Sequence, residues 1–151
     1  MPKFQRPEMK KDDKIYAVID TNVLVSSLFS SANTSNPYLV ITAVLQGIIT
    51  PLYNTEIIEE YRDVLSRKKF NFDPDLIDAL LSAFTDFGIN TFRTTTDESF
   101  LDRDDIVFYE VNLSVKDSYL VTGNTKHFPK KPFVVTPAEM VEILRTKGLL
   151  K

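Results

Sequence analysis

The chain has 151 residues, 43% of them hydrophobic, which is enough to build the core of one domain. It contains no cysteine, which excludes disulfide frameworks and thiolate metal sites, and no apolar run approaches the roughly 18 residues of a membrane-spanning helix. A net charge of −3 argues against a broad nonspecific grip on nucleic acid, but it permits an acidic nuclease centre that cations neutralise. The first residues lack the apolar segment of a signal peptide, so we expect a cytoplasmic protein.

Residues 1–13 are polar and contain proline, and we expect them to form a flexible arm ahead of a single domain at 14–151. The domain begins with a nearly continuous apolar run at 14–19, which is typical of a strand covered on both faces of a parallel sheet. This strand ends abruptly at Asp20, and the apolar residues of 23–29 then follow at the spacing of a helix face.

The rest of the chain alternates between helical and extended patterns. We expect helices at 36–47, 55–65, 73–88, 104–116 and 136–145, and strands at 48–53, 89–94, 118–122 and 133–135. Asn36 is expected to cap the first of these helices, and Thr136 begins a capping box on the last. On the helix at 73–88, the expected buried face includes Leu76 and Phe87. The alternation predicts an α/β fold, a three-layer α/β/α sandwich around a parallel sheet of four to five strands.

Acidic and amide side chains fall close to the carboxyl ends of these strands. Asp20 closes the first strand, Glu60 lies on the helix after the second, and Asn124 follows the fourth. Asp104 and Asp105 open the helix before the fourth strand. Sites in open parallel sheets gather outside the carboxyl ends of the strands, so we expect these side chains to converge. Converging carboxylates repel one another unless a cation is present, and oxygen ligands favour one or two Mg²⁺ or Mn²⁺ ions.

Each of these residues also has an ordinary structural interpretation. Asp20 could cap the helix that follows it, and Glu60 could be a solvated charge on an amphipathic helix. Asp104 and Asp105 could simply favour a helix N-terminus, and Asn124 could be a turn residue after the glycine that precedes it. The functional interpretation is favoured because the acids recur in order on separate elements that the fold brings to one edge.

Four segments carry a resemblance to a known family. They are VIDTNVLVS at 18–26, EEYRDVLSR at 59–67, DRDD at 102–105 followed by FYE at 108–110, and YLVTGN at 119–124. Together they resemble the PIN domain family, and in particular its branch of toxin components from toxin–antitoxin systems. The resemblance covers roughly residues 15–145 and keeps the order and spacing of the family motifs. It implies a PIN-like nuclease domain.

The resemblance implies specific roles for the acids. Asp20, Glu60 and Asp105 match the first three acids of the family and would serve catalysis. Asp20, Asp104, Asp105 and Asn124 would hold the metal. The family usually has aspartate where this chain has Asn124, which keeps an oxygen ligand but removes a negative charge.

Four further residues would support the site. Thr21, Asn22 and Thr122 are expected to hold the first helical turn or a metal-bound water, although local capping explains them equally well. Glu110 matches a family acid and is expected either to face the site or to hold a lysine or arginine.

Basic residues concentrate away from the acids, at 67–69 and at 126–131. Arg67, Lys68 and Lys69 are expected to form a solvated helix end, with contact to an RNA phosphate as the alternative. The single histidine, His127, is expected to be a surface residue rather than a catalytic base.

The leading hypothesis from the sequence is a Mg²⁺- or Mn²⁺-dependent endoribonuclease that hydrolyses RNA phosphodiesters through a metal-activated water. By resemblance it would be a toxin that a small antitoxin neutralises, and it would often be a homodimer. The alternative is a catalytically weak or inactive module that binds RNA or a protein partner, which Asn124 motivates. A phosphotransferase with Asp20 as nucleophile is disfavoured, because the haloacid-dehalogenase pattern needs a second acid where this chain has Asn22.

Overall fold

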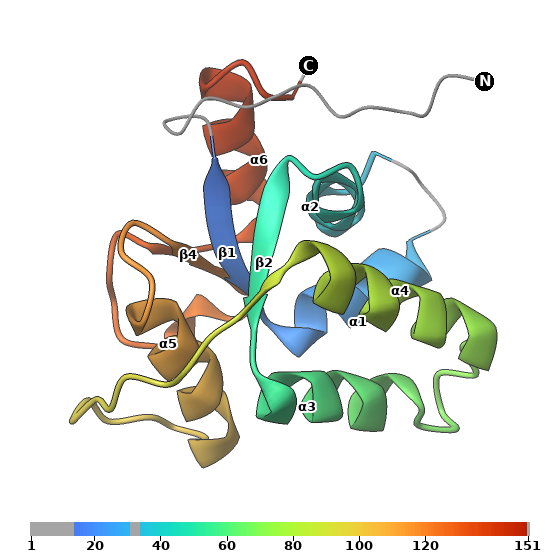
Figure 1. Cartoon of the computed structure of the whole chain (residues 1–151), viewed down its shortest axis with the longest axis horizontal. Helices are drawn as coiled ribbons and strands as arrows, with labels where there is room; N and C mark the ends of the chain where they lie inside the picture. Colours follow the sequence, from blue (N-terminus) through green and yellow to red (C-terminus); the bar gives the residue numbers. More distant parts are fainter. Residues whose placement is uncertain (1–13, 31–33, 151) are drawn as a thin grey trace.

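The structure, a computed structural model, describes residues 14–30 and 34–150, and the arm expected at 1–13 lies outside the described residues. Within them, parallel strands form one five-stranded sheet in the order β3-β2-β1-β4-β5 (Figure 1). The strands are β1 (Ile15–Ile19), β2 (Ile49–Tyr53), β3 (Ile89–Asn90), β4 (Tyr119–Val121) and β5 (Val134–Val135). None of the described helices is long and apolar enough to cross a membrane.

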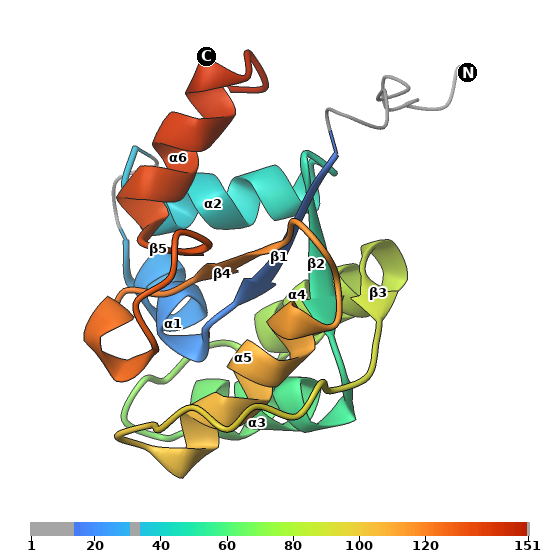
Figure 2. The same cartoon turned by 90° about the vertical axis from the view of Figure 1, so that its left-hand side faces the viewer.

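Helices cover both faces of this sheet. They are α1 (Thr21–Phe29), α2 (Asn36–Leu45), α3 (Thr55–Leu65), α4 (Pro74–Phe87), α5 (Ile106–Leu113) and α6 (Pro137–Thr146). Figure 2 shows α2 and α6 on one side of the sheet and α4 and α5 on the other. The expected three-layer α/β/α sandwich with a parallel sheet is therefore confirmed.

The central strand β1 positions the candidate site. Four of its five residues are buried, because β2 and β4 flank it and helices cover both of its faces. Ile19 is paired with Val121 of β4, and the next backbone amide, that of Asp20, donates to the Val121 carbonyl at 2.9 Å. β1 and β4 therefore end side by side, and the residues that follow them emerge at the same edge of the sheet.

Tyr61 joins α3 to this edge. Its side chain is fully buried, its ring packs against Phe84 and Phe108, and its hydroxyl donates a hydrogen bond to the Ile19 carbonyl. Burying a large side chain of this kind stabilises the fold by about 1.5–3 kcal/mol. The contact also fixes the turn of α3 that carries Glu60 beside the last residue of β1.

Two elements are shorter than the sequence pattern predicts. The strand expected at 89–94 is paired as a strand only at Ile89–Asn90, and the Thr91 amide adds one hydrogen bond to the Tyr53 carbonyl of β2 at 2.9 Å. Residues 92–101 form an irregular segment that hydrogen-bonds to α5. The helix expected at 104–116 runs only over Ile106–Leu113, after a 3₁₀ turn at Arg103–Asp105. Asp102 caps that turn by accepting a hydrogen bond from the Asp104 amide at 2.9 Å, so the chain enters α5 two residues late.

Two local predictions about helices are wrong. Ser35, not Asn36, caps α2, because the Ser35 hydroxyl accepts the Tyr38 amide and Asn36 is already helical. Leu76 and Phe87 of α4 are 48% and 47% exposed, whereas the other members of the expected apolar face are buried. The helix therefore buries a narrower stripe than its apolar content predicts.

Candidate active site

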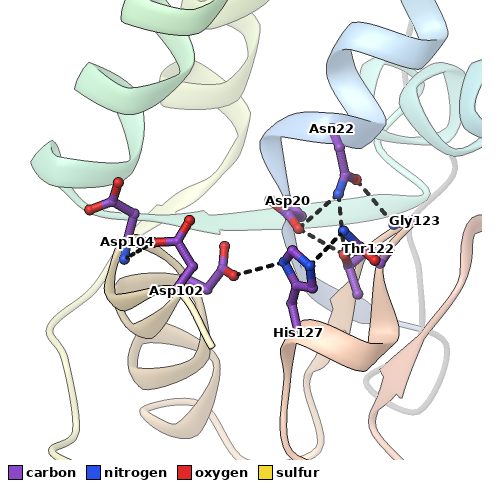
Figure 3. A network of polar contacts seen from close by, with 9 residues as sticks. Asp20, Asn22, Asp102, Asp104, Thr122, Gly123 and His127 are labelled. Carbon is purple, nitrogen blue, oxygen red and sulfur yellow. Dashed lines mark hydrogen bonds and ion pairs between the residues drawn. The ribbon is translucent and has the colours of Figure 1, made fainter. Parts of the chain in front are cut away.

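Asp20 stands at the N-cap position of α1, yet its side chain makes no capping hydrogen bond. Its Oδ2 instead accepts hydrogen bonds from the hydroxyl of Thr122, the residue after β4, at 2.7 Å and from the side-chain nitrogen of Asn22 in α1 at 3.1 Å (Figure 3). Asp20 is only 7% exposed, and burial raises the pKa of its carboxyl while the Thr122 hydrogen bond opposes that rise. The capping alternative for Asp20 therefore does not describe the side chain.

Asn22, Thr122 and Gly123 form the support of this carboxylate. The Gly123 amide donates to Asn22 Oδ1 at 3.0 Å, which turns the Asn22 amide nitrogen toward Asp20. Thr122 is fully buried and also accepts the Asn124 amide at 3.0 Å through the same hydroxyl oxygen. The predicted supporting residues Asn22 and Thr122 thus lie against Asp20, and they tie the start of α1 to the end of β4.

Thr21, the third residue expected to support the site, behaves differently. Its side chain is buried, and its hydroxyl oxygen has no hydrogen-bond partner among the described residues. A buried hydroxyl without a partner is costly, by roughly 1–3 kcal/mol. Thr21 therefore leaves an unsatisfied oxygen next to the Asp20 carboxylate.

Asp105 approaches the same edge from the opposite side. Its carboxyl Oδ2 is buried and faces His127 Nδ1 at 3.3 Å. Burial and the negative charges of Asp20 and Asp102 raise the pKa of Asp105 to about 6. Asp20 and Asp105 therefore repel each other across the site.

His127 bridges the two halves of the site, which the sequence interpretation as a surface residue did not anticipate. Its Nε2 lies 3.1 Å from the Asn124 amide nitrogen, and its Nδ1 faces Asp105. The imidazole thus links Asn124, in the loop after β4, to the 3₁₀ turn before α5. Figure 3 shows His127 between these two segments. The available signal was its spacing, three residues beyond Asn124, which one 3₁₀ turn at Thr125–His127 converts into proximity.

Glu60 and Asp104 form a second acidic pair farther along the edge. Both line a cavity of about 220 Å³, together with Arg93 and Arg103. Burial and repulsion from Asp104 and Asp63 raise the pKa of Glu60, and Asp20 contributes to the same rise. Four of the predicted acids therefore share one electrostatic environment, with Asp20 and Asp105 at its centre.

Glu110 holds an arginine rather than facing the acids. It is buried at 6% exposure, and its Oε1 lies 2.7 Å from the Arg93 guanidinium, which also pairs with Glu56 at 2.8 Å. Its other oxygen accepts the Thr96 amide at 2.8 Å. Of the two roles predicted for Glu110, the structure shows the arginine-holding one.

The predicted basic triplet at 67–69 lies at the far end of α3. Arg67 pairs with Asp63 at 3.3 Å on the exposed surface, and the Lys69 ammonium lies over the Phe70 ring at 5.1 Å. Lys68 is exposed. These side chains match the solvated helix end that was the first expectation.

The oxygen ligands at this edge suit a hard divalent cation that keeps several waters. They do not suit an ion that is enclosed entirely by protein ligands. Within the described part of the chain, no three His, Cys, Asp or Glu side chains lie close enough together to hold one ion. Mg²⁺, however, is commonly bound by one or two carboxylates, with waters and substrate phosphates completing the shell. Asp20 and Asp105 would hold such an ion, with Asn124 supplying an amide oxygen. The buried Thr21 hydroxyl oxygen, which has no hydrogen-bond partner among the described residues, is consistent with this arrangement.

A parallel sheet whose two central strands end beside buried acids defines an α/β protein with a candidate site for divalent cations. The sequence profile of the PIN domain matches residues 16–126, and the chain belongs to the PIN domain family. This family has a nuclease-type fold and typically binds divalent metals. The matched segment includes every acid discussed above and stops one residue before His127. Neither the curated proteins nor the solved structures compared with the chain gave a match.

Proposed function

We propose that the protein is a Mg²⁺- or Mn²⁺-dependent endoribonuclease that hydrolyses RNA phosphodiesters. The observation that carries this proposal is the Asp20–Asp105 pair. Burial raises the pKa of both carboxyls, and the negative charge of Asp20 raises the pKa of Asp105 further. The buried Asp105 Oδ2 faces His127 Nδ1 at 3.3 Å. Such an arrangement is unfavourable in the empty protein and becomes favourable with a cation, as in metal-dependent hydrolases.

A bound cation would supply an acidified water and positive charge beside the scissile phosphate. The chain itself supplies the orientation. Thr122 and Asn22 hold one oxygen of Asp20, and His127 keeps Asp105 and Asn124 in register. Glu60 and Asp104, on the wall of the neighbouring cavity, would bind water or a second ion on the same side.

The test is cleavage of a single-stranded RNA by the purified chain with Mn²⁺, followed on a gel. Asp20→Asn keeps the size of the side chain and removes its charge, and we expect it to abolish cleavage. Asp78→Asn, which changes an exposed acid of α4 paired with Arg62, is the matched control and should cut like the wild type. Equal cleavage by Asp20→Asn and the wild type would refute the proposal.

A second candidate function is a PIN module with weak or no catalysis that binds RNA or a protein partner. Asn124 favours it, because an amide at this position leaves the site one negative charge short of the family pattern. Calorimetric titration separates the two functions: the absence of Mn²⁺ binding at millimolar concentration would favour the module.

Through the family resemblance, the proposal also includes the role of a toxin that a small antitoxin neutralises, and a homodimeric state. Growth arrest on expression, relieved by a neighbouring gene product, is the corresponding test.

A further inference from the structure

A second basic cluster, at residues 126–131, lies directly beside the candidate site. The segment after β4 and the first turn of α6 enclose a groove of about 550 Å³, which we call the lysine groove. Its walls include Lys126, Lys130, Lys131 and a single acid, Glu139. Figure 2 shows this segment, between β4 and β5, next to the start of α6. In a chain of net charge −3, the groove is a local concentration of positive charge.

Some charged side chains of the groove already have a partner among the described residues, and others do not. Glu139 accepts the Thr136 amide at 2.9 Å as half of the capping box of α6, and Lys131 pairs with Glu98 at 3.0 Å. Lys126 and Lys130 are exposed, and no carboxylate among the described residues forms an ion pair with either. These two ammonium groups therefore remain available to an anion.

The lysine groove is continuous along the chain with the acidic centre. The turn Thr125–His127 sends His127 to Asp105 and places Lys126 on the wall of the groove. A neighbouring hollow of about 380 Å³ is lined by Gly123 and Asn124 after β4 and by Pro137 of α6, with residues of α1 and α2 as its other wall. A strand bound at the acids would therefore meet the lysines on leaving the site.

The triplet at 67–69 is a poorer place for a phosphate. Arg67 already pairs with Asp63, and the Lys69 ammonium is engaged by an aromatic ring. It also lies at the C-terminal end of α3, where the helix carbonyls give a partial negative charge. Charge complementarity therefore favours the lysine groove over the position that the sequence pattern suggested.

We propose that single-stranded RNA leaves the acidic centre along the lysine groove, where Lys126 and Lys130 each contact a backbone phosphate. This rests on the proposed function for the choice of RNA. Each phosphate contact on a single strand contributes about 0.7 to the slope of log K against log salt. Two contacts contribute about 1.4, which corresponds to roughly 25-fold in affinity at 0.1 M salt relative to 1 M.

The experiment is fluorescence anisotropy of a labelled oligouridine with the full chain in EDTA, so that no cleavage occurs, between 50 and 200 mM salt. The double variant Lys126→Gln/Lys130→Gln should bind roughly 25-fold more weakly at 0.1 M salt, with a slope smaller by about 1.4. Lys68→Gln/Lys69→Gln removes the same charge elsewhere and should match the wild type. Lys126→Arg/Lys130→Arg should restore binding, and thermal unfolding confirms that every variant is folded.

Equal binding by the Lys126→Gln/Lys130→Gln variant and the wild type, or the same loss in the Lys68→Gln/Lys69→Gln control, would overturn the proposal. A wild type that binds no oligouridine would also overturn it. Cleavage is scored separately with Mn²⁺ and the wild type. If that chain cuts no RNA but the binding pattern holds, the nuclease proposal fails while the lysine groove stands as an RNA-binding surface.

Discussion

Replacing Thr122 by valine removes the hydroxyl that holds Asp20 and leaves the shape of the side chain nearly unchanged. In the wild type, this hydroxyl donates to Asp20 Oδ2 at 2.7 Å from a fully buried position. A hydrogen bond to a charged group contributes roughly 1.5–3 kcal/mol, so we expect the free energy of unfolding at neutral pH to fall by about that amount. The same oxygen accepts the Asn124 backbone amide at 3.0 Å in a part-buried hydrogen bond, which the substitution also removes.

The same substitution should weaken cation binding at the proposed metal site. Loss of an outer partner of a metal-binding side chain typically weakens metal binding by roughly 10–100-fold. Urea unfolding gives the first quantity, and calorimetric titration with Mn²⁺ gives the second. Thr122→Ser keeps the donor and loses one methyl group, so it should retain Mn²⁺ affinity close to that of the wild type. Wild-type Mn²⁺ affinity in Thr122→Val would refute the reasoning, and an equal loss in both variants would assign the effect to packing.

Two further predictions concern the other buried acids. Glu110→Gln should lower the free energy of unfolding by about 1–3 kcal/mol and make residues 91–101 more sensitive to protease, because Arg93 loses its buried anion; an unchanged urea midpoint and digestion pattern would contradict this. The stability of the metal-free protein should fall as pH rises from about 4 to about 6. The folded-state pKa of Asp105 is about 6, above its ordinary 3.8, so the folded protein binds more protons than the unfolded protein in this range. Thermal unfolding across this range should show the fall, and Asp105→Asn should reduce it; the same slope in that variant would show that another group titrates.

The sheet could be predicted from the sequence because β1 and its neighbour β4 are apolar runs that end at polar residues. The apolar run at 14–19 and the segment before Thr122 are buried on both faces, and both end beside polar residues that the parallel topology brings to one edge. The third strand was predicted too long for a physical reason. Residues 91–94 have the composition of a strand, but Arg93 and Thr94 bond to Glu110 of α5 rather than to β2.

The site was predicted less completely than the sheet because side-chain hydrogen bonds depend on tertiary contacts. A pattern can bring Asp20 and Asp105 to one edge, but it cannot say which hydrogen bonds a side chain chooses. Asp20 stands at the cap position, and only the structure shows that the side chains of Thr122 and Asn22 hold its carboxylate. His127 was undervalued because a lone histidine among lysines usually faces solvent, whereas a three-residue turn here directs it to Asp105.

In the proposed metal site, the charge at position 124 should govern how strongly a cation binds, and Asn124→Asp tests this directly. The wild-type amide nitrogen lies 3.1 Å from His127 Nε2, and a carboxylate there would add a third acid to the Asp20–Asp105 pair. Because the added charge repels two acids that already repel each other, the metal-free variant should unfold at lower urea concentration than the wild type. Because a cation gains from the same charge, its Mn²⁺ affinity should rise, and cleavage should rise with it if metal occupancy limits the wild type. A variant with weaker metal binding than the wild type would mean that His127 and the amide, rather than charge, govern this corner of the site.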